Sequence, residues 1–195
     1  MNTTNLLIEL IVIGVAASIW IVLAVFTAFG YAWVSLDDLR LPLAAVPILA
    51  LVYIFGIVSD RIADRVFKWR WADTLNKTLF PNRSDYYDAL RLIDTQSERL
   101  SKLLEYGRIR LRICRGWAFN CILMVISLNT FTWVRLRDKP YACTISVVGT
   151  VSLVLFAVVA WYAWRDITLK SYKKIEGQVK YLTDHKSAKP KSTDV

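Results

Sequence analysis

The chain alternates between long apolar runs and strongly charged segments. Residues 10–31, 41–58, 116–133 and 141–164 each lack Asp, Glu, Lys and Arg altogether. An α-helix rises about 1.5 Å per residue, so runs of this length come close to or exceed the roughly 30 Å of a bilayer's hydrocarbon core. Four such runs in 195 residues predict a polytopic membrane protein rather than a soluble domain with buried helices.

The charges between the runs predict the orientation. Residues 60–115 carry 13 Lys and Arg against 8 Asp and Glu, and the tail from residue 165 carries 8 against 4. The two short connections, 32–40 and 134–140, hold only 4 basic residues together. By the positive-inside rule, both termini and the middle segment lie in the cytosol. The net charge of +9 then reflects basic residues near anionic headgroups, and we do not expect nucleic acid as a partner.

The middle segment has the pattern of a coiled-coil helix. Apolar and small residues alternate at spacings of four and three from Tyr86 to Leu111. The strongest positions of this seam are Leu90, Ile93, Leu100, Leu104 and Leu111. The pattern predicts a single helix from Ser84 to Trp133, about 75 Å long, that begins in the cytosol and ends across the membrane.

An apolar seam in water needs a partner surface. Three partners are open: the helix expected over residues 60–79, a second copy of the chain, or a cytosolic protein. The tail is also amphipathic, because Leu169, Tyr172, Ile175, Val179 and Leu182 share one helical face. This tail could lie on anionic lipid or pack against the long helix.

Four arginines mark the join between the charged and apolar halves of this predicted helix. They are Arg108, Arg110, Arg112 and Arg115. We interpret them as a cluster that faces lipid headgroups and helps to set the topology. Two alternatives are salt bridges to Asp60 and Asp64 on the neighbouring helix, and binding of a nucleotide or RNA phosphate at the membrane surface.

Catalytic and metal-binding patterns are not found in the sequence. The single histidine, His185, has no metal-ligand spacing around it, and no HExxH, phosphate-binding loop or nucleophile elbow occurs. Cys114, Cys121 and Cys143 form no CxxC pair, which favours apolar thiols over a redox centre. We therefore expect no catalytic residues, no metal and no cofactor, and we expect that the protein is not an enzyme.

Few polar side chains interrupt the apolar runs. Asn120 and Ser127 share a face of the third run, whereas Asn129 lies on the opposite face. Hydrogen bonds between helices are the favoured interpretation, and a polar pore lining by Asn120 and Ser127 is the alternative. Glu9 lies at the inner edge of the first run, too shallow for the buried charge expected of a coupled transporter. Gly14 and the serine four residues later predict a close helix contact.

These patterns predict an all-α fold with four transmembrane helices and a helical, coiled-coil-like cytosolic segment between the second and third. The expected regions are 1–59 (transmembrane helices 1 and 2), 60–115 (a cytosolic helical hairpin), 116–164 (transmembrane helices 3 and 4) and 165–195 (a basic amphipathic tail that ends in disorder). The lipid bilayer is the expected partner, together with further copies of the chain and a cytosolic protein.

The four-pass layout over residues 10–164, with the RIRLRICRGW join, resembles small membrane proteins of bacterial antiphage loci. This group includes the membrane subunit of the Kiwa system, accessory membrane proteins of RNA-targeting CRISPR systems, and four-pass effectors. The seam and the missing catalytic motifs predict a non-enzymatic protein that self-associates. The resemblance implies that it is a sensor or effector in the bacterial inner membrane, and it carries over no functional residues. A small stand-alone channel or transporter is the alternative.

Overall fold

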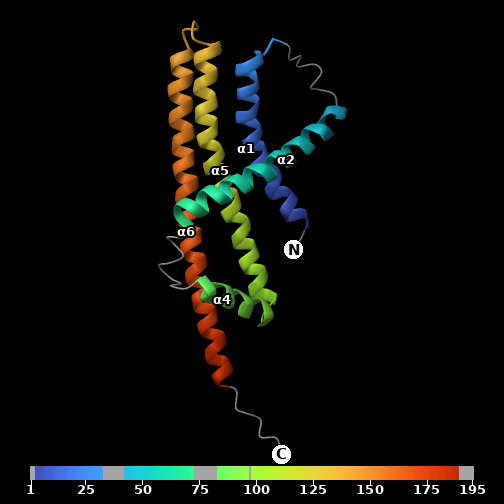
Figure 1. Cartoon of the computed structure of the whole chain (residues 1–195), viewed down its shortest axis with the longest axis vertical. Helices are drawn as coiled ribbons and strands as arrows, with labels where there is room; N and C mark the ends of the chain where they lie inside the picture. Colours follow the sequence, from blue (N-terminus) through green and yellow to red (C-terminus); the bar gives the residue numbers. More distant parts are fainter. Residues whose placement is uncertain (1–2, 33–41, 73–82, 97, 189–195) are drawn as a thin grey trace, which may run out of the picture.

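The computed structural model describes residues 3–32, 42–72, 83–96 and 98–188 (Figure 1). The elements are α1 (Thr3–Phe29), α2 (Pro42–Phe67), the π-helical turn η2 (Lys68–Ala72), α4 (Arg83–Gln96), α5 (Glu98–Arg135) and α6 (Ala142–Ala188). The described residues form no strand. The predicted all-α fold is confirmed, and α1, α2, α5 and α6 are long and apolar enough to cross a membrane.

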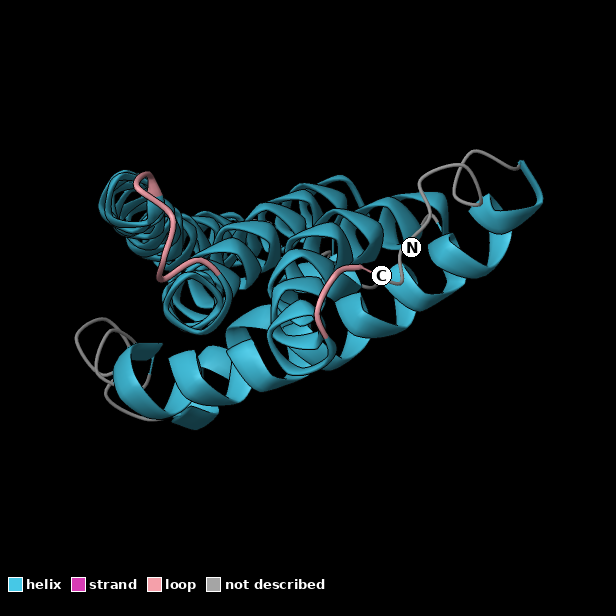
Figure 2. Ribbon diagram, turned by 90° about the horizontal axis from the view of Figure 1, so that it is seen from above, coloured by secondary structure: helices cyan, strands magenta, loops and turns pink. Residues whose placement is uncertain are grey.

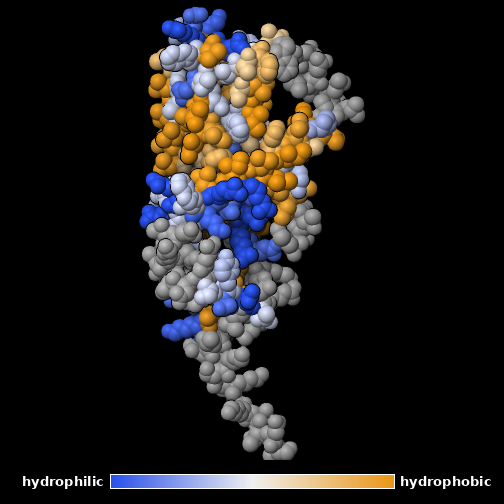
Figure 3. Space-filling view, in the orientation of Figure 1, coloured by the Kyte–Doolittle hydropathy of each residue, from blue (hydrophilic) through white to orange (hydrophobic). Residues whose placement is uncertain are grey.

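Helices α5 and α6 form the long axis of the molecule. They run antiparallel and side by side from a tight connection at residues 136–141 (Figures 1 and 2). The 47 residues of α6 span about 70 Å. Each helix is continuous from an apolar half, residues 116–133 of α5 and 142–164 of α6, into a charged half. The apolar halves with the helices packed on them are called the apolar part of the molecule, and the charged halves with α4 are called the charged part. Figure 3 shows the boundary, where an apolar surface gives way to a hydrophilic band.

Helices α1 and α2 cross at a point where both backbones come into contact. Helix α1 lies along α5, and α2 runs obliquely over both (Figure 1). A Cβ atom at Gly14 would overlap the carbonyl oxygen of Val52, and one at Gly56 would overlap that of Leu10. Only glycine permits this approach. The expected helix contact at Gly14 is therefore present, and its partner across the interface is Gly56.

The expectation of one straight helix from Ser84 to Trp133 is wrong. Helix α4 ends at Gln96, α5 begins at Glu98, and α4 turns to pack against both α5 and α6 (Figure 1). A straight continuation would leave Ala89 and Ile93 exposed to water. In the bent arrangement both are buried with Leu104 and Ile175, and burial of apolar surface is the main favourable term in folding.

Candidate functional site

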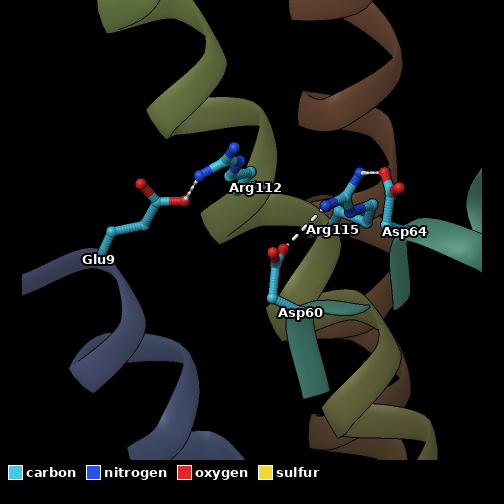
Figure 4. Close-up of polar contacts among 5 residues, drawn as sticks. All are labelled: Glu9, Asp60, Asp64, Arg112 and Arg115. Atoms are coloured by element: carbon cyan, nitrogen blue, oxygen red, sulfur yellow. Dashed lines mark hydrogen bonds and ion pairs between the residues drawn. The ribbon is translucent and has the colours of Figure 1, made fainter. Parts of the chain in front are cut away.

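Five charged side chains meet where α1, α2 and α5 cross, at the boundary between the apolar and charged parts (Figure 4). This ionic cluster consists of Glu9 from α1, Asp60 and Asp64 from α2, and Arg112 and Arg115 from α5. The two aspartates are four residues apart and the two arginines three apart, so each pair lies on one helical face. Burying an ionisable side chain in an apolar helix costs free energy, so such residues are candidates for a functional site.

Arg115 joins α5 to α2 with both of its terminal nitrogens. Nη2 donates a hydrogen bond of 2.8 Å to Asp60 Oδ1, and Nη1 donates to Asp64 Oδ1. The side chains of Arg115 and Asp60 are only 13% and 10% exposed, whereas that of Asp64 is 48% exposed. A guanidinium suits this position because its fixed fork can hold two carboxylates at once. Of the two ion pairs that Arg115 forms, the one with Asp60 is therefore the buried one.

Glu9 is the most deeply buried acid of the cluster. Its side chain has no exposed surface, and its carboxylate lies 3.5 Å from Arg112 Nη1. Neither carboxylate oxygen accepts a hydrogen bond within the described part of the chain, and the buried Nε of Arg115 also lacks an acceptor there. The cluster contains three acids and two bases. It thus holds one more acid than base, although Asp64 and Arg112 are partly exposed to solvent, at 48% and 38%.

Asn120 forms a second junction one turn further along α5. Its side chain is completely buried. The Oδ1 atom accepts hydrogen bonds from Trp20 Nε1 at 3.1 Å and from the Ser59 hydroxyl at 3.0 Å. The amide donates to the Ile13 carbonyl oxygen at 3.4 Å. Asn120 thus ties α5 to α1 and α2, and its geometry is that of a helix contact rather than of a pore lining.

The other polar residues of the third apolar run face elsewhere. Asn129 donates to the Thr150 hydroxyl at 2.7 Å and accepts from Ser146, so it joins α5 to α6. Asn120 and Asn129 therefore do lie on opposite faces of α5 and serve different helix pairs. Ser127 is half-buried, and it takes no part in the Asn120 junction.

The four arginines of the join divide into two pairs. Arg112 and Arg115 turn inward to the acids of α1 and α2, which realises the salt-bridge alternative for Arg115. Arg108 and Arg110 are exposed, and Arg110 donates to the Tyr106 hydroxyl at 2.6 Å. A face that contacts headgroups can therefore include Arg108 and Arg110, but Arg115 is engaged within the protein.

The predicted seam is covered by the tail of the same chain. Ile93 and Leu104 are buried with Ile175 of α6, and Leu90 packs at the edge of this group together with Tyr172 and Val179. This group of side chains is called the charged-part core below. Leu111 packs instead against the aromatic cluster around Trp164, and the side chain of Leu100 lies outside the described residues. The amphipathic tail, expected either on lipid or against the long helix, therefore covers Ile93 and Leu104. The expected partner helix over residues 60–79 contributes Phe67 to the cluster that Leu111 joins.

Two residues that contact the predicted site residues were not themselves predicted as site residues. The position of Glu9 at the edge of the first run predicts an acid too shallow for the buried charge of a coupled transporter, yet its side chain is fully buried and lies 3.5 Å from Arg112. Trp20 lies in the middle of the first apolar run, whereas tryptophan is favoured at membrane interfaces. That position was the available signal of a buried acceptor such as Asn120. Cys121 is buried, Cys114 half-buried and Cys143 exposed, and all three are free. His185 lies in α6, but its side chain is outside the described residues.

Comparisons with protein-family models, curated proteins and solved structures found no match to this chain. The resemblance to membrane proteins of antiphage loci therefore stays a prediction.

Proposed function

We propose that this protein is a non-enzymatic integral membrane protein that couples a cytosolic helical segment to its membrane helices. The observation that carries the proposal is the continuity of α5 and α6. Both helices run unbroken from the charged-part core into the apolar part. A helix resists bending within a few turns unless Pro, a bulge or an inserted group interrupts it. A displacement of the charged part therefore reaches the apolar part through two rigid elements.

The ionic cluster supports the same proposal, because it fastens α1 and α2 to α5 at the boundary. Arg112 and Arg115 lie at the end of the charged half of α5. Their partners lie on α1 and α2. The Arg115–Asp60 pair is buried and hydrogen-bonded, so breaking it leaves an uncompensated charge. Glu9 and Arg112 form an ion pair without a hydrogen bond. A shift or rotation of α5 must therefore move α1 and α2 or break the cluster.

If the resemblance to membrane proteins of antiphage loci holds, the protein acts in the bacterial inner membrane and responds to infection. Both termini then lie in the cytosol, and a cytosolic protein binds the charged part. Self-association is part of the proposal independently of the resemblance. The seam does not supply it, because Ile175 and its neighbours already cover Ile93 and Leu104. Further copies would have to bind through another surface.

Disrupting the charged-part core while observing the apolar part tests the coupling. Ile175→Asp places a charge in that core, whereas Gly177→Asp makes the same change at a position with open space around it. The readout is the rate at which a membrane-permeable maleimide labels Cys121, buried in the apolar part of α5, with the other two cysteines replaced by serine.

Coupling predicts faster labelling of Cys121 in the Ile175→Asp protein and an unchanged rate in the Gly177→Asp protein. Trypsin cleavage of the charged part provides the check that Ile175→Asp has opened the core. Faster cleavage with an unchanged labelling rate would show that the two parts are independent, and would refute the proposal.

A small channel or transporter is the second candidate, and the burial of Glu9 is the observation that favours it. A buried acid with no hydrogen-bond donor at its oxygens, in a cluster with an excess of acid, is a candidate ion or proton site. Flux measured in liposomes that is lost in Glu9→Gln would support transport. Absence of flux in the wild-type protein, with a cytosolic protein co-purifying, would favour coupling.

A further inference from the structure

We propose that an apolar cavity between α5, α6 and the end of α2 binds an acyl chain of one anionic phospholipid from the bilayer. The cavity has a volume of about 410 Å³, within the range of about 300–1,000 Å³ typical of small-molecule sites. It is distinct from the ionic cluster and from the charged-part core. The proposal goes beyond the proposed function, because it assigns a ligand to a surface that coupling does not require.

The shape of the cavity follows from small side chains on two facing helices. Ala118 of α5 and Ala157 of α6 both line it, and their methyl groups leave space that a larger residue would fill. Along α6 the lining extends from Val154 to Trp161, which is about 10 Å of helix. The lining is apolar throughout this length, so the cavity suits a hydrocarbon chain and offers nothing to a polar solute.

Aromatic rings close the cavity at the boundary with the charged part. Trp71 of η2 stacks edge-on against Trp161 with ring centroids 6.3 Å apart, and Phe67 contacts Trp71 at 5.0 Å. All three residues line the cavity. Tryptophan is favoured at the level of lipid headgroups, because its ring is apolar and its N–H is polar. The closed end therefore lies where the glycerol backbone of a phospholipid would lie.

One polar atom at this end lacks a partner. The indole Nε1 of Trp161 is buried and has no hydrogen-bond acceptor among the described residues. A buried tryptophan N–H ordinarily finds an acceptor. An ester carbonyl or phosphate oxygen of a phospholipid supplies one, whereas a bare hydrocarbon or a neighbouring apolar helix does not.

One basic side chain lies at this end and two more belong to η2, and we infer that they favour an anionic headgroup. The guanidinium of Arg165 lies over the Trp161 ring, 5.8 Å from its centroid. Lys68 and Arg70 flank the tryptophan at position 69 within η2, and both are exposed. The nearest acid along α6, Asp166, is paired with Lys170 at 2.6 Å. Basic pockets between membrane helices on the cytosolic side are typical sites for anionic headgroups.

The test is a lipid titration of the full-length protein in detergent, with bound lipids counted by native mass spectrometry. The probes are phosphatidylglycerol and phosphatidylcholine with identical acyl chains. We expect one phosphatidylglycerol to bind at least fivefold more tightly than phosphatidylcholine, since one basic residue near an anionic lipid changes affinity about fivefold.

Two variants separate the acyl chain from the headgroup, each with a matched control. Ala157→Leu fills the cavity and should weaken both lipids about tenfold or more, whereas Ala24→Leu makes the same change on an exposed face of α1 and should have no effect. Arg165→Gln should lower the preference for phosphatidylglycerol about fivefold and leave phosphatidylcholine unchanged. Arg137→Gln is its control, because Arg137 lies over Trp133 in the same way at the opposite end of the molecule.

Trp161→Phe keeps the ring and removes the unpartnered donor, so it should weaken both lipids about fivefold. It also keeps the proposal testable if Ala157→Leu does not fold. Equal binding of the two lipids, or equal effects of Ala157→Leu and Ala24→Leu, would overturn the proposal. A change from dimer to monomer in Ala157→Leu without loss of lipid would also overturn it, and would assign the cavity to a second copy of the chain.

Discussion

Replacement of Arg115 tests whether the ionic cluster holds the helices together. Arg115→Met keeps an unbranched side chain of similar length and removes the charge that pairs with Asp60 and Asp64. Breaking a buried ion pair from one side costs about 3–5 kcal/mol, because the remaining charge is left without compensation. Asp60 is 10% exposed and bears this cost, whereas Asp64 is 48% exposed and can be hydrated. We therefore expect a loss near the lower limit, about 3 kcal/mol.

The assay is reversible unfolding in mixed micelles of increasing SDS content, followed by tryptophan fluorescence. A loss of about 3 kcal/mol lowers the ratio of folded to unfolded protein more than 100-fold. Arg110→Met is the matched control. It removes the same charge from the same helix, but Arg110 is exposed and its side chain lies against Tyr106 rather than an acid, so its effect should stay within about 0.5 kcal/mol.

A second substitution identifies the cause. Adding Asp60→Asn to the Arg115→Met protein removes the stranded charge and should restore at least half of the lost stability. If Arg115→Met and Arg110→Met cost the same, the cluster does not fasten α2 to α5. The four arginines would then be equivalent headgroup contacts, and the coupling proposal would lose its second support.

Three further predictions concern other contacts. Gly56→Val should destabilise the protein by about 3 kcal/mol or more in the same SDS assay, because its side chain overlaps the α1 backbone. Gly177→Ala, with open space around it, should be neutral or slightly stabilising, and an equal loss in both would contradict the close crossing. Asn120→Leu should cost about 1–3 kcal/mol by leaving the Trp20 N–H without its acceptor, and wild-type stability in this variant would contradict the junction. Burial raises the pKa of Tyr86, so the packed position of α4 favours the neutral phenol. The stability that Tyr86 contributes is complete below the ordinary tyrosine pKa of about 10. It is lost as the pH rises through the raised pKa of the folded protein. Trypsin cleavage of α4 should accelerate over this alkaline range and less so in Tyr86→Phe, and identical pH profiles would refute the assignment.

The sequence by itself determined the four helices that are long and apolar enough to cross a membrane. The reason is that a run such as 141–164 has no charge for 24 residues, and a helix satisfies its backbone hydrogen bonds within a single segment in an apolar environment. Helical periodicity also placed Asn120 and Asn129 on opposite faces of α5, because the angle per residue is a property of one helix alone.

The tertiary structure decided which surfaces meet. Periodicity showed that Ile93 and Leu104 share an apolar stripe, but several partners could cover such a stripe, and the bend between α4 and α5 brings Ile175 of α6 against it. The same holds for the arginines at the join. Four similar residues in one short stretch look equivalent in sequence, yet the crossing of α1 and α2, set by Gly14 and Gly56, places acids of these two helices beside Arg112 and Arg115.

The difference has a single physical cause. Local pattern reports how one helix divides its apolar and polar faces, which depends on residues three and four apart. Partner choice depends on helices far apart in the sequence, and these are brought together by close packing that the pattern does not encode. Glu9 and Arg112 are 103 positions apart in the sequence, with two of the four apolar runs between them, yet they form one ion pair. Only the crossing of α1, α2 and α5 brings Glu9, predicted to be shallow, against Arg112, predicted to face headgroups.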